Sequence, residues 1–309
     1  MDVMVIFQTM VKLLLLLILG FALNKLHMLD AATNRKLSDL IVNVTTPMLV
    51  LSSVAAADSS NRTAVFPVLG GAFLLYIGLV LFGELFSRLP FFKKERESYA
   101  CMMVFSNSGF MGIPVMQSIY GIEAVFYNSI INFPYNIFIY SYGVFKLSGS
   151  KDEKGTNKFN PKSLLTPGLI VVLFALVLFI TGIQLPSIIT DTCDMVGDIT
   201  SPLSMLVLGS TIAMYPLKES LTDLKCYLFA FFRLILIPLI SLFFCRLLNV
   251  SDFYTGIVVL SCAMPVGSMV LMMANRYEGK NTETISRCIL VTTVLSVITI
   301  PIIAAILTL

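Results

Sequence analysis

The sequence is poor in charge, because Asp, Glu, Lys and Arg together make up only 13% of its 309 residues. An ordinary soluble domain has about a quarter. Apolar residues account for 57% of the chain, and its mean hydropathy is +0.90. A soluble domain of this length cannot bury so many apolar side chains. Long unbroken apolar runs, rather than alternating ones, favour membrane helices over a β-barrel. We therefore expect an all-α polytopic membrane protein.

The sequence also has little histidine, and its cysteines do not form a metal-binding or redox motif. The single histidine, His27, excludes a two-histidine metalloprotease motif, and the sequence has no Walker phosphate-binding loop. The six cysteines have no Cys-x-x-Cys spacing, and most lie in apolar runs, which is typical of small buried side chains. An intramembrane enzyme needs a deep histidine, an aspartate pair or a nucleophile. We therefore expect no enzyme, no cofactor and no metal site.

Ten apolar stretches are long enough to cross a bilayer, which takes about 20 residues. They are residues 3–24, 37–57, 64–86, 98–119, 122–145, 164–183, 194–214, 226–248, 253–275 and 283–307. The longest polar spacer, at 147–163, carries glycine, serine, asparagine and charges, which is typical of a solvated linker. We expect a first five-helix repeat at 1–146, this cytoplasmic linker, and a second five-helix repeat at 164–309.

Lysine and arginine are distributed unequally between the loops. The loops after the odd-numbered helices carry 16 of the 21 basic residues, and the loops on the other side carry two. The positive-inside rule therefore predicts odd-numbered loops in the cytoplasm and both termini outside, in a plasma (inner) membrane. Because five is an odd number, the two five-helix halves have opposite topology, which is the arrangement of an inverted repeat.

Sequence landmarks recur in the same order in the two halves. Thr45-Thr46-Pro47 in helix 2 corresponds to Thr200-Ser201-Pro202 in helix 7. The run SNSGFMGIP (106–114) in helix 4 corresponds to CAMPVGSM (262–269) in helix 9, and a tyrosine and a glycine follow each run. This repetition supports the inverted repeat.

Proline and glycine interrupt predicted helices 4 and 9 at these matching positions. Proline removes a backbone donor, and glycine tolerates unwound backbone. In lipid, irregular backbone persists only where it lines a cavity or packs against protein. Two broken helices that cross near the midplane would present half-helix amino termini to a small anion. The structural alternative is a simple kink, but a matched pair of breaks favours a binding site.

The run SNSGFMGIP, the Tyr-Gly after it, the AMPVGS break and the Thr-Ser-Pro of helix 7 resemble the auxin efflux carrier family. That family includes bacterial malate or malonate permease-like proteins and the plant PIN carriers, and the resemblance covers essentially the whole chain. It implies ten helices in two inverted five-helix repeats, with helices 4 and 9 crossing at the substrate site. It also implies a scaffold of helices 1, 2, 6 and 7 and a transport domain of helices 3–5 and 8–10, which move as an elevator.

The chain departs from the plant members at two points. Plant carriers usually have proline where this chain has Ser106, so we expect the first crossing helix to unwind through Ser106–Gly109. The long cytoplasmic loop of many plant members is absent, and so the phosphorylation control associated with it is not expected.

The candidate substrate-binding residues lie at the two breaks and on helix 5. They are Asn107, Ser108, Gly109, Ile113, Pro265, Val266, Gly267, Asn132 and Asn136. The Asn107 amide can donate to a carboxylate without burying a charge. Asn132 and Asn136 lie on one face of helix 5, where they either line the same cavity or join helices. Lys12 and Arg233 lie within helices and are candidates for attracting an anion; snorkelling or pairing with an acid are the alternatives.

The sequence therefore predicts a secondary transporter that moves small organic anions, mono- or dicarboxylates, by elevator-type alternating access. One alternative is a sodium-coupled organic-anion symporter of the bile-acid type, although only Asn107 and the hydroxyl groups are obvious ligands near the breaks. A ligand-sensing receptor is the other alternative; it would usually need a signalling domain after helix 10. The expected partners are a small carboxylate substrate and the lipid bilayer, with a homodimer left open and no nucleic acid.

Overall fold

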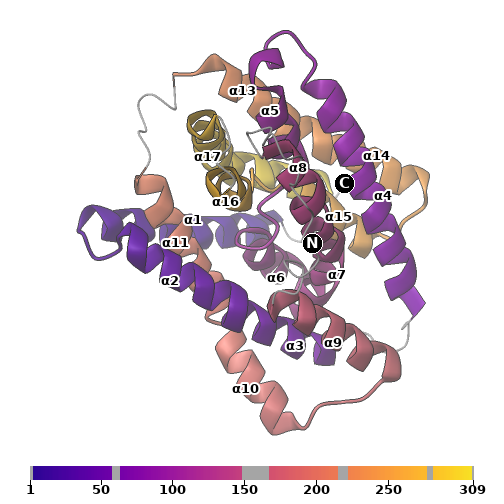
Figure 1. Cartoon of the computed structure of the whole chain (residues 1–309). Coiled ribbons are helices and arrows are strands. Elements are labelled where there is room, and N and C mark those ends of the chain that lie inside the picture. Colours follow the sequence, from indigo (N-terminus) through magenta and orange to yellow (C-terminus); the bar gives the residue numbers. More distant parts are fainter. Residues whose placement is uncertain (1–2, 58–62, 148–166, 215–221, 277–280, 308–309) are drawn as a thin grey trace, which may run out of the picture.

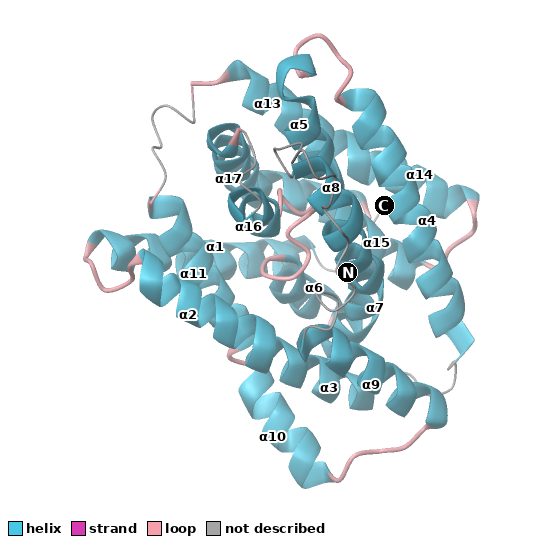
Figure 2. Ribbon diagram, in the orientation of Figure 1, coloured by secondary structure: helices cyan, strands magenta, loops and turns pink. Residues whose placement is uncertain are grey.

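The computed structural model of the chain describes residues 3–57, 63–147, 167–214, 222–276 and 281–307. Regular structure within these ranges is helical (Figures 1 and 2). The β pairing found in them is an isolated antiparallel bridge between Ser106 and Val266. The prediction of an all-α chain is confirmed for the described residues.

Several helical stretches suit a bilayer. By length and composition, the described stretches that can cross a membrane are Ala31–Ala56, Val65–Phe86, Ser187–Ala213, Leu224–Leu247 and Thr282–Ile306. Pro167–Thr181 and Asp252–Ala263 are shorter apolar helices. Such a set of apolar helices is that of a multi-pass membrane protein.

The first half of the chain contains eight α-helices within the described ranges. They are α1 (Val3–Lys25), α2 (Ala31–Leu40), α3 (Thr46–Ala56), α4 (Val65–Phe86), α5 (Arg96–Val104), α6 (Gly112–Tyr120), α7 (Ile122–Phe138) and α8 (Val144–Leu147). The π-helical turn η1 (Ile41–Thr45) joins α2 to α3 just before Pro47, whose ring displaces the preceding turn. A second π-helical turn, η4 (Ile139–Gly143), joins α7 to α8. The predicted helix 98–119 is divided into α5 and α6.

The second half is built in a similar way. It contains α9 (Pro167–Thr181), α10 (Ser187–Gly197), α11 (Thr200–Ala213), α13 (Leu224–Phe231), the π-helical turn η6 (Phe232–Leu236), α14 (Ile237–Leu247), α15 (Asp252–Ala263), α16 (Ser268–Arg276) and α17 (Thr282–Ile306). The predicted helix 253–275 is divided into α15 and α16. The expected linker at 147–163 lies, apart from Leu147, outside the described residues.

One group of helices is joined by close backbone contact. α1 packs along α11, and α3 packs against α9 and α10. A Cβ atom at Gly20 would overlap a backbone oxygen of α11, and one at Gly209 would overlap a backbone oxygen of α1. Glycine therefore lets these two backbones touch, as small residues do in membrane helix pairs. The Asn34 amide donates to the Ser210 hydroxyl at 2.8 Å and joins α2 to the same pair.

A second group surrounds the two breaks. α4 packs against α5 and α7, α14 against α15, and α13 against α17 (Figure 1). At one end, the Glu84 carboxylate of α4 pairs with Arg96 at 2.8 Å and with Lys146, and it accepts a 2.8 Å hydrogen bond from the Tyr142 hydroxyl. Three chain segments are thereby joined around one partly buried carboxylate.

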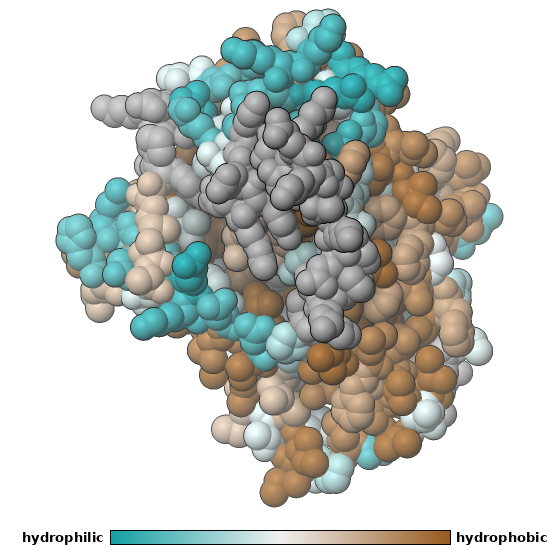
Figure 3. All heavy atoms as spheres, in the orientation of Figure 1, coloured by the Kyte–Doolittle hydropathy of each residue, from teal (hydrophilic) through white to brown (hydrophobic). Residues whose placement is uncertain are grey.

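Exposed apolar side chains cover much of the outer surface. On α4, Leu74, Leu81 and Leu85 are each about two-thirds exposed, at 69%, 66% and 67%. Figure 3 shows hydrophobic residues over α4, whereas hydrophilic residues gather at the end formed by α5 and α13 and near the turn between α1 and α2. An apolar belt with polar ends is the surface that a lipid bilayer requires.

Candidate functional site

Two breaks in the helices meet inside the second group. The first break, residues 105–111, separates α5 from α6, and the second, residues 264–267, separates α15 from α16. The Asn107 N–H donates to the Pro265 carbonyl at 2.8 Å, and the Gly267 N–H donates to the Phe105 carbonyl at 3.0 Å. The breaks that proline and glycine predict are therefore hydrogen-bonded to each other in an antiparallel bridge.

Sequence explains why α15 ends where it does. Pro265 has no N–H, and its ring cannot continue the helix. The Val266 N–H donates to the Thr292 hydroxyl of α17 at 3.2 Å, not to a carbonyl of its own helix. A Cβ atom at Gly267 would lie 2.9 Å from the Ser106 carbonyl oxygen, so glycine is needed for the two breaks to approach this closely.

Helix α7 braces the first break with amide side chains. The Ser108 hydroxyl donates to Asn132 Oδ1, and Asn128 Nδ2 donates to the Ser108 carbonyl at 3.2 Å. The Ser261 hydroxyl of α15 in turn donates to Asn128 Oδ1 at 3.3 Å. Asn128 was not among the predicted site residues, although it lies four residues before Asn132 on the same helix face. The Asn136 amide instead donates to the Asn132 carbonyl within its own helix, at 2.9 Å.

Asn107 differs from these bracing amides. It is buried, with 5% of its surface exposed, yet its side-chain amide has no hydrogen-bond partner among the described residues. Gly109, two residues later, is exposed, and no atom lies within 4 Å of a Cβ added there. Ile113 and Val266 are buried in the apolar core. The first break thus combines an unpartnered amide with one open position.

Three backbone N–H groups of the crossing are not available to a ligand in this conformation. Those of Asn107, Val266 and Gly267 already donate to protein acceptors. The expectation that such groups are freed for a carboxylate is therefore wrong for these three. The reason is that the two breaks and α17 satisfy each other's donors.

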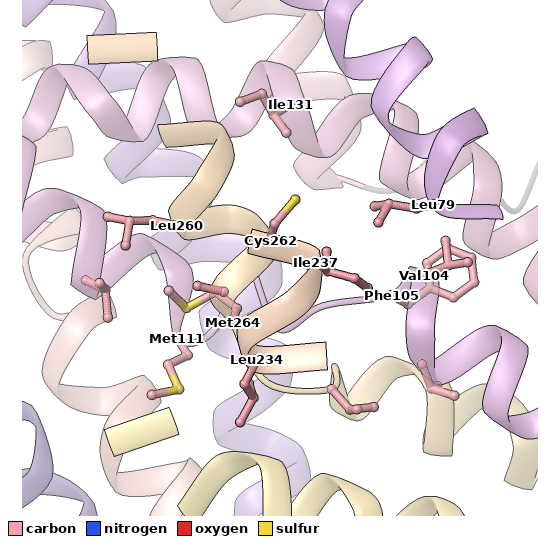
Figure 4. Packing of buried hydrophobic residues seen from close by; sticks show 14 of the residues in the cluster. Leu79, Val104, Phe105, Met111, Ile131, Leu234, Ile237, Leu260, Cys262 and Met264 are labelled. Atoms are coloured by element: carbon pink, nitrogen blue, oxygen red, sulfur yellow. The ribbon is translucent and has the colours of Figure 1, made fainter. Parts of the chain in front are cut away.

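The structure places Arg233 beside the second break. Arg233 lies in η6 and is fully buried, so it does not snorkel to the surface. Its Nη1 donates to the Cys262 carbonyl at 2.7 Å, while Nε and Nη2 have no hydrogen-bond partner in the described part of the chain. Figure 4 shows Cys262 at the end of α15 and Met264 of this break among buried apolar side chains, with Leu234 and Ile237 close by. A guanidinium group therefore lies in an apolar setting with two donors unused.

Lys12 has a different environment. It is exposed on α1, and the described residues offer it no hydrogen bond or ion pair. A cavity of about 950 Å³ lies between α4 and α14, and its lining is mainly apolar, including Leu81 and Phe244. No residue of either break lines this cavity. Within the described ranges, no three His, Cys, Asp or Glu side chains lie together as a metal site would require.

Comparisons with known proteins show which family the chain belongs to. A family model described as membrane transport protein matches residues 5–304. An uncharacterized transporter of Methanothermobacter thermautotrophicus is 25% identical over 310 residues, which cover 95% of this chain and 96% of that protein. The uncharacterized transporter YfdV of Escherichia coli K12 is 22% identical over 283 residues, 87% of each chain. The chain therefore belongs to the membrane transport protein family, the auxin efflux carrier family that its motifs resemble.

Proposed function

We propose that this transporter moves small carboxylates across the plasma membrane as a secondary carrier and binds them at the crossing of the two breaks. Two observations carry the proposal: the amide of Asn107 in the first break has no hydrogen-bond partner among the described residues, and the buried guanidinium of Arg233 is bonded to the helix end just before the second break. One antiparallel bridge joins the two breaks. Both groups donate hydrogen bonds, and a carboxylate is an acceptor-only ligand. Membership of a transporter family favours a carrier over an enzyme.

The substrate can be identified by uptake into proteoliposomes that contain the full chain. We would supply labelled lactate, acetate, succinate and malonate, with and without proton and sodium gradients. Uptake of at least one carboxylate above that of protein-free vesicles is expected. Uptake that requires a sodium gradient would favour the sodium-coupled symporter instead. If no carboxylate enters while a neutral or cationic solute does, the proposed substrate class is wrong.

We further propose that the ten predicted helices form two inverted repeats and that the group around the breaks moves against α1, α2, α3, α9, α10 and α11. The support is the close packing of α1 along α11 and of α3 against α10, together with the matched breaks in predicted helices 4 and 9. Helix α3 also packs against α7 of the other group, so the two groups share an extended contact. Between the groups, the Ser201 hydroxyl of α11 donates to Gln117 Oε1 of α6 at 3.0 Å. A sliding motion has to break this hydrogen bond.

A crosslink across that contact tests the motion. Gln117→Cys with Ser201→Cys, bridged by a short bifunctional maleimide, should abolish transport and leave substrate binding from one side. The matched control is Asn34→Cys with Ser210→Cys, which crosslinks two residues within the scaffold and should leave transport intact. Full transport with the first crosslink formed would indicate local gating without movement of the whole group.

The orientation of the chain is a separate proposal, based on the unequal distribution of basic residues. Positions 61 and 155 lie in loops on opposite sides of the membrane in this topology, and both are outside the described residues. A membrane-impermeant maleimide added outside cells should label Asn61→Cys and spare Gly155→Cys. The reverse pattern would invert the orientation and leave the inverted repeat untouched.

A further inference from the structure

Arg233 is an unusual charge for the membrane interior. Among the described residues, it is the only charged side chain in the fully buried set. The ion pairs of the described residues, around Glu84, Arg246 and Arg287, do not include it. Tyr76 and Tyr135 lie close enough to interact with it, but both are neutral partners. An arginine cannot be deprotonated in a protein, so this charge stays.

The position of Arg233 explains why the protein tolerates the charge. The Cys262 carbonyl has lost its usual helical donor, because the chain departs from the helix at Pro265 and Val266. Nη1 of Arg233 donates a hydrogen bond to this carbonyl at 2.7 Å in place of the missing backbone N–H. The carboxyl end of a helix carries a partial negative charge of about half a unit, which offsets part of the guanidinium charge. The remainder has no countercharge among the described residues.

The unused edge of the guanidinium has the geometry of a carboxylate receptor. Nε and Nη2 are the two nitrogens without partners, and they lie on the same edge of the planar group. Their N–H bonds are parallel and match the two oxygens of a carboxylate in a bidentate pair. Nη1, which points elsewhere, is the nitrogen bonded to the protein. Arg233 therefore has one side bonded to α15, and the two nitrogens of its other edge have no hydrogen-bond partner among the described residues.

We infer that Arg233 makes the empty substrate site a fixed monocation, so that the carrier selects monovalent carboxylates and exchanges one for another. The inference rests on the proposed function, in which the crossing binds substrate and moves. With a monoanion bound, the site is neutral. When empty it carries one positive charge, and with a dianion one negative charge. Because a charge inside the bilayer is costly, the monoanion-loaded form crosses most readily and the empty form returns slowly.

The test is exchange in proteoliposomes at a clamped membrane potential, with lactate as the monoanion and succinate as the dianion. Uptake of labelled lactate should be at least about tenfold faster into vesicles preloaded with unlabelled lactate than into empty vesicles. A tenfold difference in rate corresponds to about 1.4 kcal/mol in the barrier for the return of the carrier. Lactate–lactate exchange should not depend on the potential, because the loaded site is neutral. Preloading with succinate should accelerate lactate uptake less than preloading with lactate does.

Variants of Arg233 separate a charge effect from a packing effect. In Arg233→Gln the loaded site would carry a negative charge, so lactate exchange should become sensitive to potential, by up to about 50-fold per 100 mV. Acceleration by preloading should disappear, because the empty site is then neutral. Arg233→Lys keeps the charge but loses the bidentate edge, so it should bind lactate more weakly and remain insensitive to potential. Arg246 lies on the same long helix as Arg233, Leu224–Leu247, and its exposed side chain pairs with Asp252 of α15. Arg246→Gln should therefore behave like the parent protein.

Three results would overturn the inference. They are equal uptake into empty and preloaded vesicles, potential-dependent lactate exchange in the parent protein, and unchanged behaviour in a folded Arg233→Gln variant. If Arg233→Gln does not fold, the parent protein and Arg233→Lys still decide the question through preloading and potential.

The two proposals fail in different ways. If the parent protein moves no carboxylate, the proposed function is wrong; if lactate moves without exchange behaviour, only the role of Arg233 is wrong.

Discussion

The two breaks occupy matching places in the two halves but differ in chemistry. The first, at 105–111, carries its own polar side chains, and amides from α7 brace it. The second, at 264–267, has the sequence Met-Pro-Val-Gly and no side-chain donor of its own. Its polar partners come from neighbouring helices, with the Thr292 hydroxyl on one side and the Arg233 guanidinium on the other.

This difference indicates a division of roles within the site. An amide at the first break offers a neutral donor, whereas the second break is associated with a fixed positive charge. A binding site made from two identical halves would present the same chemistry twice. In the site that we propose, one half would orient a substrate through Asn107, and the other would neutralise its carboxylate through Arg233. The predictions below test whether the two breaks form one site and whether their roles differ.

The largest effect is expected from separating the breaks. Gly267→Ala places a Cβ 2.9 Å from the Ser106 carbonyl oxygen, a backbone atom that cannot move aside cheaply. Overpacking of this kind costs about 1–3 kcal/mol, and it should also break the bridge that joins the two helices. We expect loss of transport and a lower melting temperature in detergent. Gly70→Ala is the matched control, because nothing lies within 4 Å of its added Cβ. Full transport by Gly267→Ala would mean that the bridge is dispensable.

The next effect concerns the neutral half of the site. Asn107→Leu removes the unpartnered amide with little change in volume. Loss of a hydrogen bond to a charged group should weaken carboxylate binding by about 10- to 150-fold. Asn43→Leu is the control, since the Asn43 amide donates only to the Asp39 carbonyl of its own helix. Equilibrium binding of the transported carboxylate measures both. Unchanged affinity in Asn107→Leu would assign recognition to the Arg233 half alone.

An effect on stability, without loss of a substrate contact, should distinguish two adjacent threonines behind the second break. Thr292→Val removes the acceptor of the Val266 N–H and leaves that donor unsatisfied in the core, at a cost of about 1–3 kcal/mol. The Thr293 hydroxyl is buried without a partner, so Thr293→Val should be neutral or stabilising. Thermal unfolding in detergent compares the two. Equal destabilisation would show that α17 does not hold the second break through this hydrogen bond.

The smallest effect should come from a charge outside both breaks. Hydrogen bonds from the side chain and backbone of Thr33 lower the pKa of Asp30 below its ordinary value of 3.8. A carboxylate with a lowered pKa stabilises the fold above its ordinary pKa and loses that contribution as pH falls through the lowered value. The melting temperature of the parent protein should therefore fall slightly more on acidification than that of Asp30→Asn. A large difference would mean that this exposed helix end rivals the breaks in importance.

Much of the fold could be predicted from the sequence, for physical reasons. Apolar runs of spanning length predict helices because lipid leaves no other partner for the backbone. Proline and glycine at matching places predicted the breaks at 105–111 and 264–267, because proline cannot donate and glycine admits close approach. The break residues Asn107 and Pro265 are hydrogen-bonded as the crossing requires, through backbone atoms.

The environment of individual polar residues could not be predicted in the same way. Position along a helix does not say which face a side chain occupies, so the sequence left Arg233 open to snorkelling. Thr292 was missed because hydroxyl side chains are common in membrane helices and its position carries no spacing signal. Asn128 does share the four-residue spacing of Asn132 and Asn136, but the spacing alone does not show that its amide contacts the first break. The use of backbone N–H groups by the protein itself depends on a contact between segments about 160 residues apart, which no local pattern encodes.

The central claim is that the crossing is where a carboxylate binds, and cysteine protection at Gly109 tests it most directly. Gly109→Cys adds a thiol at an exposed position with no atom within 4 Å of the new Cβ, and the six native cysteines are all buried. The transported carboxylate should slow labelling of this thiol by a maleimide, whereas its neutral amide analogue should not. Labelling that proceeds at the same rate with saturating carboxylate would contradict the account and place the site elsewhere.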